Sequence, residues 1–294
     1  MSAIAIPLAL AAGLRPNMAR QARGVTPCRG GIEMDEVGAT FLEIGTPAQA
    51  RAIAVRAQPG GEPGLFWLGG FKSDMQGTKA QALARWAADQ GRACVRFDYS
   101  GHGESHGVFA DGTIGRWLEE SLAVFDAFCR GRQVVVGSSM GAWLALLLAR
   151  EVRRRAETGS AGRAAIAGLV LIAPAVDFTE VLMWEKFPAK VRREIEKNGV
   201  WQRPSLYSEE SYPITRRLIE EGRQHLLLGQ MIETGCPVRI LQGVQDPDVP
   251  WNHAVELVSR FARDDVVLTL VKDGDHRLSR PEDVERLITA IAEF

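Results

Sequence analysis

The sequence predicts an α/β fold, in which helices cover both faces of a mostly parallel β-sheet. Two observations lead to this prediction. From residue 39 to about residue 175, short apolar segments of strand type alternate with longer segments whose apolar residues recur every three or four positions. The same alternation resumes near residue 238 and continues to residue 291. Repeated units of this kind place the strands in one direction and the helices above and below them.

The composition is that of a globular protein. Of the 294 residues, 46% are hydrophobic and 24% are charged, and 35 basic residues against 36 acidic ones give a net charge of −1. Without a basic excess, the chain has little electrostatic attraction for nucleic acid or an anionic membrane. The longest apolar stretch, residues 3–12, is shorter than the roughly 20 residues of a membrane-spanning helix. We therefore expect no nucleic-acid partner and no integral membrane segment.

The cysteines give no pattern of a metal site or a disulfide framework. They occur singly, without a CxxC pair and without a histidine at zinc spacing. This usage predicts free thiols, a reducing compartment and no bound metal. The four positions are Cys28, Cys94, Cys129 and Cys236.

Residues 1–33 are expected to lie outside the folded domain, which would comprise residues 34–294. This extension is rich in arginine and poor in acids, and it shows no helical or strand period. A secretory signal is not predicted, because the first arginine follows the apolar segment instead of preceding it. Two interpretations remain open, an organellar transit peptide and a non-native extension from an upstream start codon.

The first three strands are predicted from alternation and from one continuous apolar run. Residues 39–44 and 51–58 alternate in the manner of strands, and a turn with glycine and proline at residues 45–47 separates them. Residues 65–68 are all apolar and end at two glycines. Such a run is typical of a strand that is buried on both faces.

The middle of the domain continues the alternation. A helix is predicted over residues 78–90, where Leu83, Trp86 and Ala87 share one face and Gly91 ends the helix. The next helix has apolar residues at every third or fourth position, and the one after it is apolar all round, as expected for a buried helix. In chain order the ranges are strand 93–97, helix 114–128, strand 133–136, helix 143–149 and strand 168–172.

A break in the alternation, from about residue 176 to 235, predicts a helical cap inserted over the carboxyl edge of the sheet. Its charge is heavy but balanced, and it contains two helical stretches.

Ser279 and Glu282 have capping-box spacing, with Pro281 in the first turn of the last helix. The elements after the cap are strand 238–241, helix 252–261, strand 266–271 and helix 281–291.

The segment Gly137-Ser138-Ser139-Met140-Gly141 matches the pattern G-x-S-x-G between a strand and a buried helix. By composition alone the pattern is weak, but at this junction it is typical of a nucleophile elbow, in which a strained turn presents the central serine. The competing interpretation is a loop of glycine and serine without chemistry. We expect Ser139 to be the nucleophile.

A serine hydroxyl needs an adjacent base that a third group orients. In this architecture an acid and then a histidine follow the serine, each in a loop after a later strand. Asp246 follows strand 238–241, and His276 follows strand 266–271. Asp248, two residues further on, is the rival acid.

Two backbone N–H groups would form the oxyanion hole. One is expected from Met140, directly after the nucleophile, and the other from Phe71, in the loop after strand 65–68. Gly69 and Gly70 could equally be ordinary turn glycines.

The glycine-rich segment 101–107 resembles a dinucleotide fingerprint, but its third glycine is one position late and no acidic strand end follows it. Binding of a nicotinamide cofactor is therefore not expected.

These residues together resemble the α/β-hydrolase family and, within it, the group of palmitoyl-protein thioesterases and acyl-glucuronide esterases that has mitochondrial and bacterial members. The likeness covers residues 39–294, with Ala142 as a departure where a glycine is often seen. The matching segments are 69–80, 94–101, 137–141, 199–201, 207–210, 249–251 and 275–277, together with Asp246.

The resemblance implies an α/β-hydrolase fold with an eight-stranded, mostly parallel sheet, a triad of Ser139, Asp246 and His276, and no metal or cofactor. It favours an acylated cysteine as substrate. Cleavage of small esters or acyl-glucuronides is the alternative, with Arg203, Arg216 or Arg217 holding a sugar carboxylate. A third hypothesis is a hydrolase fold that binds a ligand without turnover.

Aromatic residues are the expected walls of an acyl pocket, although they could equally fix the cap to the sheet. The four aromatic candidates are Trp143, Trp184, Trp201 and Trp251.

The bacterial cytoplasm is the expected compartment, or the mitochondrial matrix in a eukaryote, and the oligomeric state is not predicted.

Overall fold

The computed structural model describes residues 38–46, 50–204 and 211–294. The extension predicted for residues 1–33 and the matching segment 207–210 lie outside the described residues, as does Cys28. The remaining cysteines, Cys94, Cys129 and Cys236, are buried free thiols.

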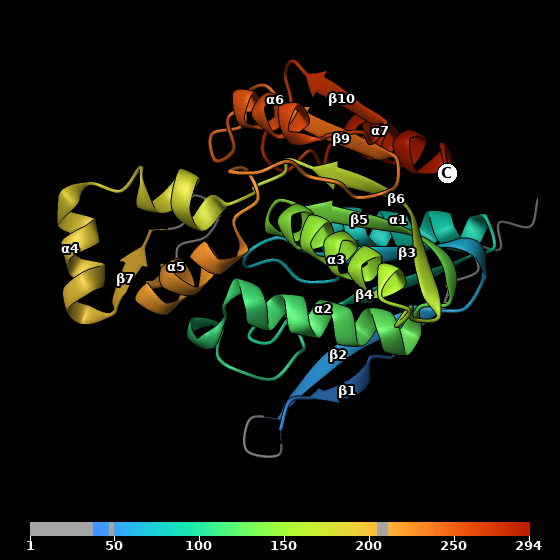
Figure 1. Ribbon diagram of the computed structural model, residues 1–294, viewed down its shortest axis with the longest axis horizontal. Coiled ribbons are helices and arrows are strands. Elements are labelled where there is room, and N and C mark those ends of the chain that lie inside the picture. Colours follow the sequence, from blue (N-terminus) through green and yellow to red (C-terminus); the bar gives the residue numbers. More distant parts are fainter. Residues whose placement is uncertain (1–37, 47–49, 205–210) are drawn as a thin grey trace, which may run out of the picture. The chain divides into compact units, whose positions relative to one another are not determined.

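An eight-stranded sheet forms the centre of the described domain (Figure 1). Its strand order is β1-β2-β4-β3-β5-β6-β9-β10, and only the pairs β1–β2 and β2–β4 are antiparallel. The predicted fold class is therefore confirmed. The strands are β1 (Thr40–Ile44), β2 (Arg51–Gln58), β3 (Gly61–Leu68), β4 (Arg92–Phe97), β5 (Gly131–Ser138), β6 (Ala164–Ile172), β9 (Val238–Gly243) and β10 (Val266–Val271).

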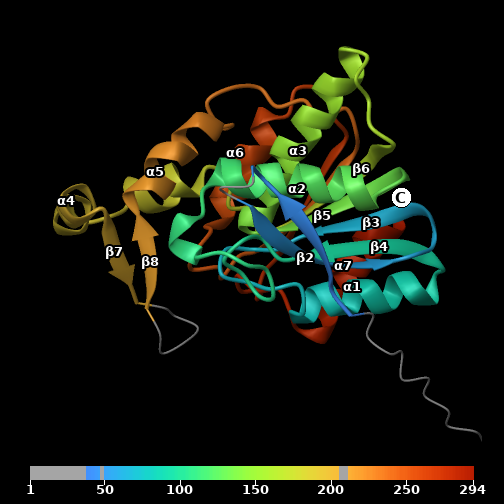
Figure 2. The same ribbon diagram turned by 90° about the horizontal axis from the view of Figure 1, so that it is seen from below.

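Helices cover both faces of this sheet, and two separate apolar clusters mark the two faces (Figure 2). Successive residues of a strand point to opposite faces, so Val134 and Val136 belong to one cluster and Val135 to the other. Helices α1 and α7 contribute to the first cluster, and helices α2, α3 and α6 to the second. Their bounds are α1 (Thr78–Asp89), α2 (Ile114–Phe128), α3 (Met140–Glu157), α6 (Trp251–Arg260) and α7 (Pro281–Ala292).

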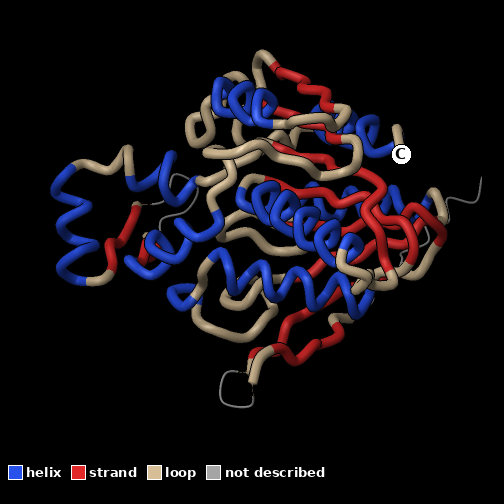
Figure 3. Tube along the Cα trace, in the orientation of Figure 1, coloured by secondary structure: helices blue, strands red, loops and turns tan. Residues whose placement is uncertain are grey.

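The cap segment, residues 176–235, contains the hairpin β7–β8, which the sequence analysis does not predict (Figure 3). Each of its strands has only four residues, too few for a strand period to stand out. In the described part of the segment, residues 176–204 and 211–235, the elements are a π-helical turn η2 (Thr179–Trp184), α4 (Ala189–Asn198), β7 (Val200–Arg203), β8 (Tyr212–Thr215), α5 (Arg216–Gly222) and the 3-10 turn η3 (Arg223–His225).

Two carboxylates hold the cap segment: one joins its two ends to each other, and the other joins it to α2. The buried Asp177 accepts hydrogen bonds from the backbone N–H groups of Leu227 (2.9 Å) and Leu228 (2.8 Å). Glu221 of α5 accepts one from the N–H of Gly115 (3.0 Å), in the first turn of α2. A carboxylate at a helix N-terminus also interacts favourably with the helix dipole. The two ends of the segment are therefore joined to each other, and α5 is joined to α2.

The predicted capping box at Ser279 and Glu282 is wrong by one position. Helix α7 has Arg280 as its N-cap, and Asp283 at the third helical position accepts hydrogen bonds from the backbone N–H (3.3 Å) and Nε (2.8 Å) of Arg280. The Nε atom of Arg280 lies 2.8 Å from Asp283 and 3.4 Å from Glu282, so Asp283 is the nearer partner of the N-cap residue. Within the described ranges, no helix has both the length and the apolar content that crossing a bilayer demands.

Candidate active site

Ser139 occupies the junction between β5 and α3, where the chain turns sharply. Its backbone has φ 54° and ψ −116°, a conformation that non-glycine residues rarely adopt. The flanking glycines allow this turn. A Cβ atom on Gly137 would be 2.4 Å from the carbonyl oxygen of Gly141, and one on Gly141 would be 2.1 Å from that of Leu68. The spacing G-x-S-x-G therefore has a steric cause on both sides of the serine.

Three predicted residues come together at one edge of the sheet. The strands β5, β9 and β10 are aligned in the same direction, so the residues that follow them meet at their carboxyl ends. The Oγ atom of Ser139 is 3.1 Å from Nε2 of His276, 137 positions away in the chain. Nδ1 of His276 is 2.8 Å from Oδ2 of Asp246. These distances form one continuous hydrogen-bonded path from the hydroxyl to the carboxylate.

The carboxylate of Asp246 has no exposed side-chain surface and is surrounded by donors. Its Oδ1 accepts hydrogen bonds from the N–H groups of Asp248 and Val249, both at 2.8 Å. Its Oδ2 accepts a second bond from Nε2 of Gln242 at 3.2 Å. Buried carboxylates need such partners, and here the partners also fix the oxygen that faces His276.

Asp248, the rival acid, faces the cap segment. Its Oδ1 is 3.9 Å from the guanidinium of Arg203, on β7. The ligand atoms of Asp246, Asp248 and His276 lie within 4.8 Å of one another, as in a small cation site. The Nδ1 atom of His276 and Oδ2 of Asp246 are directly hydrogen-bonded, however. That contact favours a proton-relaying pair over a pair of metal ligands.

The loop that carries His276 is held by a lysine that the sequence analysis does not single out. The Nζ of Lys79, in the first turn of α1, donates hydrogen bonds to the carbonyl oxygen of Arg277 and to Oγ of Ser279. Burial lowers the pKa of Lys79 to about 8. Because 198 positions separate Lys79 from Arg277, no local sequence pattern could have revealed this contact.

The loop after β3 runs directly beside Ser139. A Cβ atom on Gly70 would be 3.4 Å from the Cβ of Ser139, so glycine permits the close approach. The N–H groups of Phe71 and Met140 have no hydrogen-bond acceptor among the residues that the structure describes. Two unpaired donors near the hydroxyl are what an oxyanion hole requires. Their role stays a prediction.

The side chain of Phe71 is the centre of an aromatic cluster that the sequence analysis misses. Its ring centroid is 4.9 Å from that of Phe109, 5.6 Å from that of Phe178 and 5.8 Å from that of Tyr212. Phe178 follows β6, and Tyr212 begins β8. The loop beside Ser139 is therefore packed against the cap segment, which only the tertiary structure reveals.

The four tryptophans expected at the substrate occupy different environments. Trp143 is completely buried, and its indole N–H donates to the carbonyl oxygen of His225 (3.2 Å). Trp184 lies under the guanidinium of Arg223, and Trp201 packs against Phe187 at 5.2 Å. Trp251 is 45% exposed. Trp143 joins α3 to the cap segment, whereas the contacts of Trp184 and Trp201 lie within that segment. Substrate contact stays a prediction for all four.

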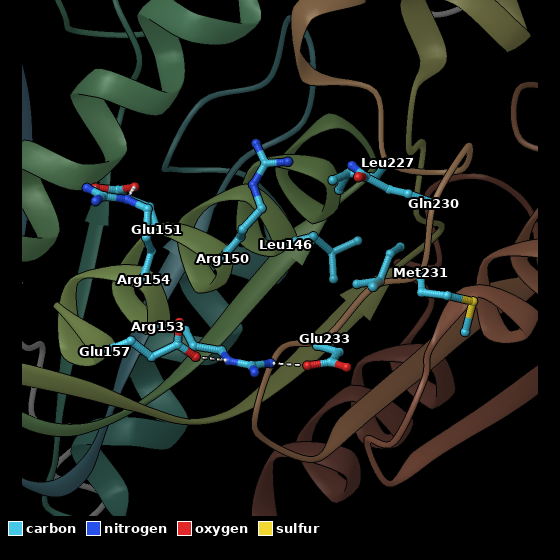
Figure 4. A pocket seen from close by; sticks show the side chains of 11 residues that line it. Leu146, Arg150, Glu151, Arg153, Arg154, Glu157, Leu227, Gln230, Met231 and Glu233 are labelled. Carbon is cyan, nitrogen blue, oxygen red and sulfur yellow. Dashed lines mark hydrogen bonds and ion pairs between the residues drawn. The ribbon is translucent and has the colours of Figure 1, made fainter.

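A cavity of about 430 Å³ lies along α3 (Figure 4), and Ser139 is not among the residues that line it. It is bounded by side chains of α3, such as Leu146 and Arg150, and by residues 230–233. Leu146 is seven positions beyond Ser139, which corresponds to roughly 10 Å along a helix axis. This cavity is therefore separate from the Ser139 site.

Comparison with known proteins identifies the family of this chain. The sequence model of the Alpha/beta hydrolase family matches residues 44–287. The chain belongs to this family. The family's members share the order of serine, acid and histidine that the loops of this sheet bring together.

Three proteins within or related to this family are similar to this chain in sequence or structure. The chain is 36% identical over 242 residues to the human protein named palmitoyl-protein thioesterase ABHD10, mitochondrial, and the match covers 81% of this chain and 75% of the relative. A crystal structure of a putative hydrolase from Agrobacterium vitis has a TM-score of 0.83 and 48% identity, covering 87% of this chain and 97% of that one. The mouse alpha/beta hydrolase domain-containing protein 10 has a TM-score of 0.74 and 33% identity, covering 87% and 98%. The predicted ester or thioester hydrolase is supported by these relatives.

Proposed function

We propose that this protein hydrolyses acyl thioesters through a covalent acyl-enzyme on Ser139. The observation that carries the proposal is the hydrogen-bonded path from Ser139 through His276 to Asp246. The hydroxyl alone is a weak nucleophile, and the adjacent imidazole supplies the base it needs. Asp246 holds the ring with Nδ1 protonated, which leaves Nε2 free to accept the serine proton.

The reaction has two halves. Ser139 Oγ attacks the carbonyl carbon while its proton passes to Nε2 of His276, and the carbon–sulfur bond then breaks as the thiol leaves with a proton. In the second half His276 takes a proton from water, the hydroxide attacks the acyl-serine ester, and the carboxylic acid is released as Ser139 regains its proton. The N–H groups of Phe71 and Met140 stabilise the negative oxygen in both halves.

An S-acylated cysteine is the substrate we favour. The relatives named palmitoyl-protein thioesterase support this class, since the chain covers three quarters of their length. A thiolate with a pKa near ~8.5 also leaves more readily than an alkoxide. The aromatic cluster around Phe71 supplies apolar surface next to the nucleophile.

Hydrolysis of esters or acyl-glucuronides is the second candidate, and Arg203 is the residue that favours it. Its guanidinium lies near Asp248, whose carboxylate is close to His276. Arg216, by contrast, pairs with Glu220 at 2.7 Å on the surface of α5. Of these two arginines, Arg203 is thus the one that lies beside the proposed triad.

A comparison of three substrate classes tests the proposal. Long-chain acyl thioesters, short aryl esters and acyl-glucuronides are assayed with the wild-type protein, Arg203→Met and Ser139→Ala. We expect the highest kcat/KM for thioesters, with Arg203→Met affecting only the glucuronide. Negligible thioester cleavage beside fast ester cleavage would overturn the thioesterase assignment.

The bacterial cytoplasm or the mitochondrial matrix stays the predicted compartment.

A further inference from the structure

His102 lies in the glycine-rich segment 101–107, which the proposed mechanism does not use. Its side chain is only 4% exposed, and both ring nitrogens have partners. Nε2 accepts a hydrogen bond from the backbone N–H of Lys72 at 3.1 Å. Nδ1 is 3.2 Å from the carbonyl oxygen of Ser100. Since the Lys72 N–H can only donate, Nε2 is the unprotonated nitrogen and Nδ1 carries the proton.

The surroundings keep this ring neutral and fixed. The rings of Tyr99, Phe109 and Trp117 lie 5.1–5.6 Å away with their planes steeply inclined to the imidazole. Burial lowers the pKa of His102 to about 4. A protonated ring would also place an N–H group against the N–H of Lys72. His102 is therefore built to accept a hydrogen bond and has no free nitrogen for proton transfer with a substrate.

The residue that His102 holds is strained. Ser73 N–H donates to the carbonyl oxygen of Gly70 at 3.1 Å, which closes a β-turn over residues 70–73. Lys72, the third residue of this turn, has φ 60°. Glycine usually takes that position in a type II turn, because a side chain is disfavoured there. A flip of the peptide between Phe71 and Lys72 would relieve the strain, but it would turn the Lys72 N–H away from His102.

We propose that His102 is a positioning residue for oxyanion stabilisation, which it serves by holding the turn that presents the Phe71 N–H. The inference rests on the proposed function, because it needs that N–H to face the developing negative charge. Phe71 lies one residue before Lys72 and one after Gly70, which approaches Ser139. A turn that flips between two states would offer the donor for only part of the time, and the transition state would lose stabilisation.

Variants of His102 separate this role from simple packing. His102→Phe keeps an aromatic ring in the cluster but removes the acceptor, whereas the amide of His102→Gln can accept from Lys72 and donate to Ser100. We expect His102→Phe to lower kcat by about 10- to 100-fold, with KM changed less than about twofold. His102→Gln should retain most of the kcat. Binding of an acyl trifluoromethyl ketone, which forms an oxyanion, should weaken in His102→Phe by the same factor as kcat.

A second substitution tests the strain directly. Glycine at position 72 adopts φ 60° without strain, so Lys72→Gly in the His102→Phe background should recover part of the lost kcat. An unchanged kcat in His102→Phe, or a change confined to KM, would overturn the inference. Ser139→Ala is measured in parallel. Turnover that persists in Ser139→Ala refutes the proposed function. If Ser139→Ala loses turnover but His102→Phe turns over normally, only the positioning role is refuted.

Discussion

Asp246 and His276 share a hydrogen bond of 2.8 Å between Oδ2 and Nδ1, while Asp248, two residues later, lies beside Arg203 of the cap segment. The two aspartates are close in sequence but face different partners. Backbone N–H groups fix one oxygen of Asp246, which leaves the other for the imidazole and Gln242. The geometry thus distinguishes the two acids that the sequence left as rivals.

Matched amide substitutions test this distinction. Asp246→Asn presents an N–H or an uncharged oxygen to His276 and should lower kcat by about 10⁴, because the ring loses the required tautomer. Asp248→Asn should change kcat by less than about tenfold. Steady-state kinetics with one acyl thioester measures both, and far-ultraviolet circular dichroism verifies folding. The assignment is wrong if Asp248→Asn is the more damaging change.

Backbone strain at Ser139 predicts a difference in stability between two inactive variants. A non-glycine residue at φ 54° costs on the order of 1–3 kcal/mol, and glycine avoids that cost. Ser139→Gly should therefore have a free energy of unfolding at least about 1 kcal/mol above that of Ser139→Ala, despite the greater freedom of its unfolded chain. Urea denaturation measures the difference. Equal stabilities would show that the turn is not strained.

Burial of His102 predicts a loss of stability in mild acid. Its pKa is lowered from 6.5 to about 4 in the folded state, with the charge of Lys72 disfavouring protonation and that of Asp74 favouring it. The unfolded chain takes up the proton first, so the contribution is fully present above pH 6.5 and is lost as the pH falls toward 4. Between pH 7 and pH 5 the loss should be about 2 kcal/mol.

The same urea experiment on His102→Gln isolates this contribution. The variant lacks the titrating group, so its stability should fall less between pH 7 and pH 5 than that of the wild-type protein. The buried His253, whose pKa is also lowered by burial, contributes equally to both proteins and cancels in the comparison. Parallel pH profiles for the two proteins would contradict the burial of a neutral His102.

Trp143 and Trp251 should respond differently to substitution. Trp143 is completely buried, so Trp143→Ala should cost about 3–5 kcal/mol of unfolding free energy. Trp251 is 45% exposed, and Trp251→Ala should cost less than about 1 kcal/mol. Thermal and urea denaturation check both values. A mild effect of Trp143→Ala would indicate that its packing is loose and would revive the expected acyl pocket there.

The proposed triad could be predicted from the sequence because its signals are local. Ser139 is marked by glycines whose spacing follows from steric contact with Gly141 and Leu68. Asp246 and His276 each follow a strand, and parallel strands bring their loops to one edge. The G-x-S-x-G spacing, combined with the rule that parallel strands end at one edge of a sheet, was sufficient to predict these three residues.

Other features depend on contacts between distant segments and could not be predicted. The hairpin β7–β8 is too short to show a strand period. Lys79 and His102 form hydrogen bonds with loops far away in the sequence, and no sequence pattern reveals either contact. The sequence identifies Trp143 only as a large apolar residue. The packed structure is needed to show that it lies in the core and not in the wall of a pocket.

The proposed reaction requires a covalent acyl group on Ser139 during each turnover, and trapping this intermediate tests whether it forms. The protein is mixed with a long-chain acyl thioester, quenched in acid within the first turnover and digested for mass spectrometry. We predict an added acyl mass on the peptide that contains Ser139, and none in Ser139→Ala, which should also lose at least about 10⁴ in kcat. An acyl group on another residue, or turnover that survives in Ser139→Ala, would refute an acyl-enzyme on Ser139.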